Sequence, residues 1–167
     1  HAMMGMSACT KNLFGTIPGL TKSEYHYRFP NHTDFANMLI DLNEYFKFDI
    51  NIVDAIIGMD GNGPTMGNPK KIGLILASTN PYALDYICSK IINLDPKCVE
   101  TVKESLKRNL FNVDNIILNN DYQKYIVKDF NNIKSNIDIR FFDNSLKGYF
   151  LKKILDNKPY CKNAKCI

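Results

Sequence analysis

The sequence predicts an α/β domain in which helices flank a largely parallel or mixed sheet. Two dense runs of β-branched and apolar residues, at 50–57 and 72–77, are typical of strands covered by other elements. Segments with apolar residues at helical spacing alternate with these runs. Strands that alternate with helices indicate a layered α/β fold. We therefore expect a single α/β domain over residues 1–155, followed by a tail at 156–167.

Composition is consistent with one globular domain. The chain has 167 residues, of which 45% are hydrophobic and 23% charged. Its net charge of +4 comes from scattered Lys and Arg residues, so we expect no nucleic-acid partner. No apolar run approaches the roughly 20 residues of a membrane span, and no secretory leader is visible, which predicts a cytoplasmic protein without a membrane partner. His1 is either native or a cloning scar.

The first part of the chain carries little periodicity. Helix breakers are frequent in residues 1–30, and we expect only a short helix at 7–14 that ends at Gly15. Asn31 or Thr33 can cap the next helix. The apolar positions of that helix form a one-sided stripe made of Phe35, Met38, Leu39, Leu42, Tyr45 and Phe46.

The sequence pattern in the middle of the chain predicts a strand, a loop, a second strand and a helix. The nearly continuous apolar run at 50–57 favours a strand that is buried on both faces. A glycine-rich loop at 58–69 follows, and then the second strand at 72–77. Asn80 can cap the next helix, and Pro81 is well suited to its first position.

The last part of the chain predicts more elements of both types. A helix over about 99–108 has Glu104 and Arg108 at the spacing of an ion pair. Three elements follow it: a third strand at 113–118, a fourth strand at 137–142 and a terminal helix at 145–155.

The five cysteines show no spacing typical of a disulfide framework, which favours reduced thiols in the cytoplasm. Cys88 lies among apolar residues and is expected to be a buried free thiol. The sequence stops at Cys166-Ile167, which resembles the start of a C-x2-C-x2-C-x3-C-P run. On this interpretation Cys166 is the first cluster ligand, and its partners lie beyond the last residue.

The glycine-rich loop Gly58–Pro69 is the first candidate site. It follows the carboxyl end of a predicted strand, where open α/β sheets place ligands, and its glycines allow backbone N–H groups to approach an anion. It does not match a phosphate-binding P-loop, a dinucleotide fingerprint or a calcium-binding EF-hand. The candidate ligand-binding residues are Asp60, Gly61, Asn62 and Gly63. A simple loop between two strands is the alternative.

Four further residues carry chemistry that binding sites use. Lys11 and Asn12 lie beside a helix end, where they can bind phosphate or carboxylate or remain solvated. Asp54 lies inside an apolar strand, so its carboxylate must be paired, hydrogen-bonded or protonated. Asp85, one turn into its helix, points either into a pocket or toward the helix N-terminus. Structural roles remain open for both carboxylates.

Two histidines, His26 and His32, flank an aromatic stretch and suit acid–base or metal chemistry. No third ligand occurs at a recognisable spacing, so we expect no metal site there. The sequence also lacks a Gly-x-Ser-x-Gly motif or a Cys/His pairing typical of nucleophilic catalysis.

Three stretches together resemble one family: Met6–Gly15, Ile56–Pro64 and Leu76–Asp85. They are similar to an uncharacterised bacterial and archaeal family known as iron–sulfur centre proteins. In many members this domain precedes a ferredoxin module with two [4Fe–4S] motifs. The resemblance implies that the chain is the carboxyl-terminal α/β half of a larger domain. It also implies [4Fe–4S] clusters in the full-length protein, with Cys166 as a ligand, and no cluster in this fragment. The chain departs from the family pattern at Asn80, where Asp is favoured.

Two functions follow as expectations. The first is a redox-linked protein whose α/β domain binds a small molecule or anion near Lys11, Asn12, Asp54 and the loop at 60–63, while the missing module exchanges electrons. The second is a non-enzymatic docking or electron-carrier module for a redox partner protein, with no substrate pocket of its own. The family has no established reaction, so the sequence leaves open whether the protein is an enzyme.

Overall fold

The structure is a computed structural model that describes residues 4–63 and 65–132. The chain divides into a compact unit of residues 1–136 and a second unit of residues 137–167, and the description below concerns the first. Several expectations lie outside the described residues: the strand at 137–142, the helix at 145–155, the tail at 156–167, and Cys161 and Cys166.

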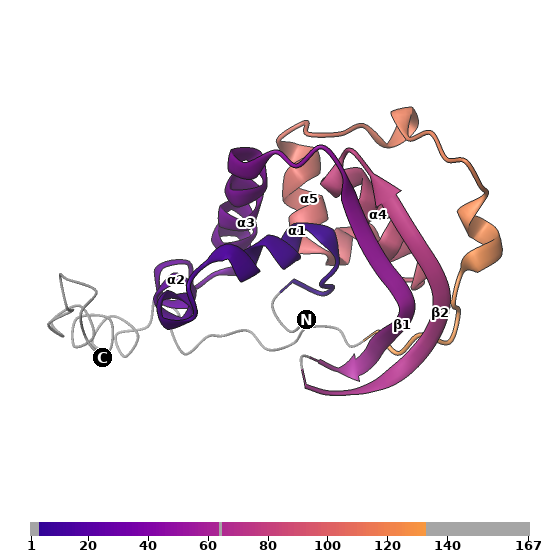
Figure 1. The fold of residues 1–167 in the computed structure, drawn as a ribbon, viewed down its shortest axis with the longest axis horizontal. Coiled ribbons are helices and arrows are strands. Elements are labelled where there is room, and N and C mark those ends of the chain that lie inside the picture. The colour runs from indigo at the N-terminus through magenta and orange to yellow at the C-terminus, as the bar shows by residue number, and fades with distance from the viewer. Residues whose placement is uncertain (1–3, 64, 133–167) are drawn as a thin grey trace, which may run out of the picture. The chain divides into compact units, whose positions relative to one another are not determined.

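Residues 4–63 and 65–132 contain five α-helices and two strands. Figure 1 shows how these elements are arranged. The helices are α1 (Cys9–Asn12), α2 (Lys22–Arg28), α3 (His32–Phe46), α4 (Pro81–Ile91) and α5 (Glu100–Lys107). The strands are β1 (Asn51–Asn62) and β2 (Met66–Ser78). Short 3₁₀ helices occupy Leu13–Thr16, Gly19–Thr21, Pro96–Cys98, Val113–Asn115 and Tyr122–Tyr125.

The two strands form one long antiparallel hairpin. The register runs from the pair Asn51–Ser78 to the pair Asn62–Met66, with an irregularity between Ala55 and Ile57. The α/β class is confirmed, because helices pack on a sheet, but the described strands pair antiparallel rather than parallel. A connection as short as 63–65 permits only antiparallel pairing, since a parallel pair needs a long crossover.

The expected loop at 58–69 is wrong as secondary structure. Both strands continue through this segment, and only 63–65 separates them. The glycines predicted a loop because glycine weakens strands. In the structure, the hydrogen-bonded pairing between β1 and β2 continues through these glycines. Of the glycines at this end of the hairpin, Gly61 has a positive φ of 77°, which a residue without Cβ adopts readily.

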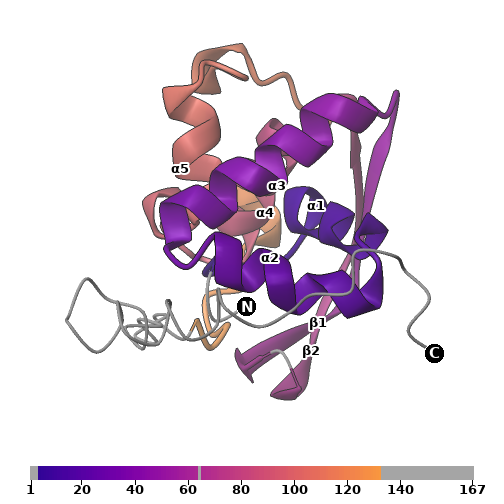
Figure 2. The same ribbon diagram turned by 90° about the vertical axis from the view of Figure 1, so that its left-hand side faces the viewer.

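Helices cover one face of the hairpin and leave the other open (Figures 1 and 2). Burial alternates along both strands. On the open face Ile52, Ile57 and Ile75 are 64%, 65% and 67% exposed. The expectation of a strand buried on both faces is therefore wrong for the described residues. Although the run of apolar residues is continuous, side-chain burial alternates along it, because helices pack on one face of the hairpin alone among the described residues.

The core lies between the covered face of the sheet and helices α4 and α5. Its buried members are Met6, Leu84, Cys88, Ile92, Val99 and Val102. The strands contribute Val53, Ile72 and Leu76 to this cluster. Complete burial of a large apolar side chain is worth about 1.5–3 kcal/mol, so this layer stabilises the packing of the sheet against the helices.

The predicted caps of two helices are confirmed. Asn31 is the N-cap of α3, and its side-chain oxygen accepts a hydrogen bond of 2.7 Å from the backbone N–H of Asp34. Asn80 is the N-cap of α4, and its side-chain oxygen accepts hydrogen bonds of 3.0 Å from Tyr82 N and 2.9 Å from Ala83 N. These bonds satisfy amide groups that a helix leaves free in its first turn.

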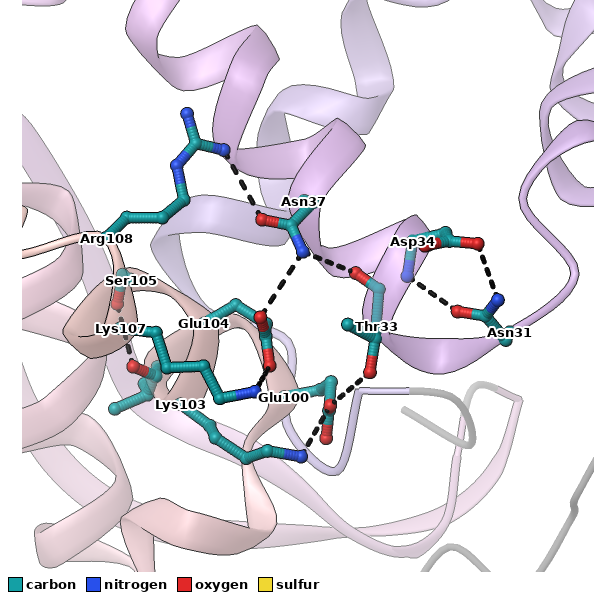
Figure 3. A network of polar contacts seen from close by, with 11 residues as sticks. Asn31, Thr33, Asp34, Asn37, Glu100, Lys103, Glu104, Ser105, Lys107 and Arg108 are labelled. Carbon is teal, nitrogen blue, oxygen red and sulfur yellow. Dashed lines mark hydrogen bonds and ion pairs between the residues drawn. The ribbon is translucent and has the colours of Figure 1, made fainter.

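A polar network joins α3 to α5 (Figure 3). The Asn37 amide donates to the Glu104 carboxylate at 3.3 Å, and Glu104 forms an ion pair with Lys107. Arg108 instead reaches across to Asp41 at 2.7 Å. The expected pair between Glu104 and Arg108 is therefore wrong, because each side chain finds a partner elsewhere. Every acid of this network has a cationic or amide partner.

Two other expectations differ from the structure. The helix expected at 7–14 is split into α1 and a 3₁₀ turn, and α2 was not predicted because the breakers around it mask its short pattern. The strand expected at 113–118 is wrong. The side chain of Asn112 caps a 3₁₀ turn there, and Ile117 is 95% exposed, so its apolar side chain has no layer to join.

We predict that Gly67→Ala destabilises the hairpin. A Cβ at this position lies 2.4 Å from the carbonyl oxygen of Asp60 and 2.4 Å from the Met59 side chain. Such overpacking costs about 1–3 kcal/mol, which urea unfolding of the chain measures. The matched control is Gly63→Ala, whose Cβ meets only the Met59 sulfur at 3.9 Å. Equal unfolding free energies for the two variants would contradict the described pairing.

Candidate functional site

Asp85 joins α4 to the start of α1. One carboxylate oxygen accepts a hydrogen bond of 2.6 Å from Cys9 N, and the other accepts one of 3.0 Å from Thr10 N. The side chain of Ala8 caps nothing, so Asp85 serves from a distance as the cap of α1. Among the alternatives that the sequence left open, the geometry of Asp85 is that of a structural anchor.

The environment of Asp85 is almost dry. The residue is 2% exposed, and burial raises the pKa of its carboxyl. The backbone N–H groups of Cys9 and Thr10, which donate to this carboxylate, act against that rise in pKa. Both carboxylate oxygens are thus committed to backbone amides that would otherwise be buried without a partner.

The end of the hairpin holds a later part of the chain. Asp60 is 8% exposed, and its carboxylate accepts a hydrogen bond of 3.3 Å from Asn131 N. Gly61 N donates to Asn131 O at 2.9 Å, and Lys70 forms an ion pair with Asp129. One carboxylate oxygen of Asp60 and the N–H of Gly61 are therefore bonded within the chain.

The remaining candidates lie apart from one another. Asp54 is on the open face of the sheet, where its carboxylate accepts a hydrogen bond of 3.0 Å from Ile56 N. Asn12 and Asn62 are exposed, and Gly63 N donates to Gly61 O at the turn of the hairpin. The structure does not gather the carboxylates of Asp54, Asp60 and Asp85 into one site. Each of them bonds to a different stretch of backbone.

Lys11 has basic neighbours that the sequence analysis did not connect with it. The ammonium groups of Lys11 and Lys22 lie 6.0 Å and 5.8 Å from the centre of the same Phe14 ring. The His26 ring packs edge-on against Phe14 at 5.2 Å and stacks on Phe35 at 4.7 Å. We call Lys11, Lys22 and His26 the basic cluster.

Charge in the basic cluster is not balanced by acids. Burial lowers the pKa of Lys11, and the ammonium group of Lys22 lowers it further. Burial and then Lys11 lower the pKa of His26. Within 4–63 and 65–132, the ion pairs include neither Lys11 nor Lys22. The spacing of Lys22 and His26, four residues apart on α2, is the signal that could have found them.

Burial raises the thiol pKa of two of the described cysteines, Cys9 and Cys88. Burial, aided by Asp85, raises the pKa of Cys9 to about 12, and burial also raises the pKa of Cys88. Cys88 is a buried free thiol, as expected. Across the described part of the chain, no three His, Cys, Asp or Glu side chains gather as a metal site would require. In the same residues, no helix combines the length and apolarity needed to span a membrane.

We predict that Asp85→Asn destabilises the chain by about 1–3 kcal/mol, because the amide NH₂ would face one of the two backbone donors. The control is Asp54→Asn, which keeps an oxygen for Ile56 N on an exposed face and should stay within about 0.5 kcal/mol. Denaturant unfolding at neutral pH measures both variants. A loss at Asp54 as large as that at Asp85 would contradict the anchoring role.

Comparison with known proteins adds a family. A sequence model described as "Domain of unknown function (DUF362)" matches residues 1–90, which is more than half of the chain. The chain is 36% identical over 103 residues to the "Thylakoid-associated protein sll1697" of Synechocystis sp. (strain ATCC 27184 / PCC 6803 / Kazusa). That match covers 61% of this chain but 32% of the relative, so the chain spans about a third of the relative's length. No solved structure matches the chain significantly. The chain belongs to the DUF362 family.

Proposed function

We propose that this chain is part of an iron–sulfur protein with a redox function, and that its described domain binds a small molecule. Support for the clusters comes from the three family-like stretches and from Cys166, which falls where a first ferredoxin ligand would stand. The [4Fe–4S] clusters would belong to a longer protein of which this chain is a part. A redox partner protein would exchange electrons with them.

The described cysteines do not fit such a cluster. Cys9 and Cys88 are held as protonated thiols by burial, whereas iron needs thiolates. Cys98 is exposed, but no other candidate ligands gather with it among the described residues. Among the cysteines of this chain, we therefore propose Cys166 as a cluster ligand rather than Cys9 or Cys88.

One observation carries the binding of a small molecule. Lys11 keeps an ammonium group in a half-buried position without a carboxylate partner among the described residues. A partly desolvated and unpaired charge is costly, and functional sites are where such groups concentrate. We place the ligand at Lys11 rather than at 58–69, because Asp60 and Gly61 already bond to Asn131.

A second candidate function is a docking or electron-carrier module without a substrate pocket. The open face of the hairpin favours it, since Ile52, Ile57 and Ile75 expose about two thirds of their surface. Exposed apolar patches commonly mark interaction surfaces. The two functions separate experimentally, because only the first requires a small molecule to bind near Lys11.

We also propose a cytoplasmic location. The free state of Cys9, Cys88 and Cys98 supports it, because reduced thiols are the rule in that compartment. The name of the Synechocystis relative associates that protein with thylakoids. Cell fractionation of the organism that makes this chain distinguishes a cytoplasmic from a membrane-associated protein.

Reconstitution with iron and sulfide tests the redox proposal. We predict that this 167-residue chain, treated without oxygen, gains no stoichiometric cluster, because the described cysteines do not gather. A longer version that includes the ferredoxin module should gain [4Fe–4S] clusters that a chemical reductant bleaches. Iron and labile-sulfide analysis of both proteins is the measurement. A cluster in the short chain, or none in the longer protein, would overturn the proposal.

A further inference from the structure

We propose that Lys11, Lys22 and His26 form a binding site for a small, doubly charged oxyanion, of the kind that a phosphate group or a dicarboxylate provides. The inference rests on the proposed function, since it names the ligand class of the small-molecule site at Lys11. It also adds two residues, Lys22 and His26, that the sequence did not connect with that site.

The first argument is the missing counter-charge. Between α3 and α5, lysine side chains are paired with carboxylates. Figure 3 shows Glu100 with Lys103 and Glu104 with Lys107. The basic cluster instead places two ammonium groups around one phenyl ring, with no carboxylate bound to either among the described residues. Mutual repulsion and desolvation both disfavour this arrangement in the free protein.

The second argument is the pair of buried rings beside the charges. Phe14 is 7% exposed and Phe35 is fully buried, so both rings belong to the packed interior. The imidazole of His26 lies flat on Phe35, with 6° between the ring planes, and meets Phe14 edge-on. Lys11 comes from α1 and the other two residues from α2, so two helices bring basic side chains to the same pair of aromatic rings.

The third argument is the charge that such a site accepts. The lowered pKa of His26 favours its neutral ring, which still offers one N–H donor. Two ammonium groups remain, and a single carboxylate would neutralise only one of them. An oxyanion with two negative charges neutralises both, and its oxygens accept the short, charge-assisted hydrogen bonds that ammonium groups form. The buried rings of Phe14 and Phe35 strengthen these interactions by lowering the local dielectric constant.

Calorimetric titration of the 167-residue chain tests the inference. The probes are inorganic phosphate and malonate, with chloride adjusted to keep the ionic strength constant, because salt screens such contacts. We expect at least one probe to bind, and Lys11→Gln or Lys22→Gln to weaken that binding about tenfold or more. Phosphate alone would identify phosphate groups as the natural class, and malonate alone would identify dicarboxylates.

The matched control is Lys71→Gln, which removes the same charge from an exposed position on β2. It should leave the dissociation constant within about twofold. A second readout separates a binding role from a structural one. Without the anion, Lys11→Gln should unfold at a temperature equal to or above that of the unmodified chain, because it removes a desolvated, repelled charge.

Two results would overturn the inference. One is the absence of binding for both probes at millimolar concentration. The other is equal binding by the Lys11→Gln and Lys71→Gln variants, which would indicate attraction to net charge alone. This outcome is independent of the iron measurement. Anion binding by the chain, with no cluster in the longer protein, would support the anion site and contradict the redox proposal. Clusters in the longer protein, with no anion binding by the chain, would support the redox proposal and contradict the anion site.

Discussion

The arrangement of the described domain depends on one buried carboxylate. Asp85 lies on α4, yet its two oxygens accept hydrogen bonds from Cys9 N and Thr10 N, more than seventy residues earlier. α1 has four residues and is too short to be stable alone, because the free energy gained from one helical turn is smaller than the cost of nucleating a helix. The carboxylate therefore fixes where the first helix begins and, through it, where the side chain of Lys11 lies.

The buried acids of the described domain have bonding partners within the chain, whereas two of its lysines have no carboxylate partner there. The buried acids Asp60, Asp85 and Glu104 all bond to groups of the chain, so their charge serves the fold. The ammonium groups of Lys11 and Lys22 form no ion pair among the described residues. We propose that a bound ligand offsets the free-energy cost of holding these two charges together. The ligand site that we propose is therefore the basic cluster and not the glycine-rich end of the hairpin.

The sequence predicted those features that local interactions decide. Asn31 and Asn80 were recognisable as caps because a cap depends on a few adjacent residues. The hairpin was misread because the exposure of Ile52 and Ile75 depends on which face the helices cover, and no local pattern records that. The anchoring by Asp85 and the meeting of Lys11 with Lys22 join segments across loops. Sequence spacing alone cannot reveal such contacts, although it indicated Lys11 and Asp85 as residues of interest.

Native-state hydrogen exchange at two amides tests the central claim most directly. If Asp85 holds the start of α1, the N–H groups of Cys9 and Thr10 should exchange only when the domain unfolds as a whole. Their protection should then equal that of amides in the middle of α4. Exchange of Cys9 and Thr10 near the rate of an unstructured chain, with α4 still protected, would contradict the anchor and with it the placement of the basic cluster.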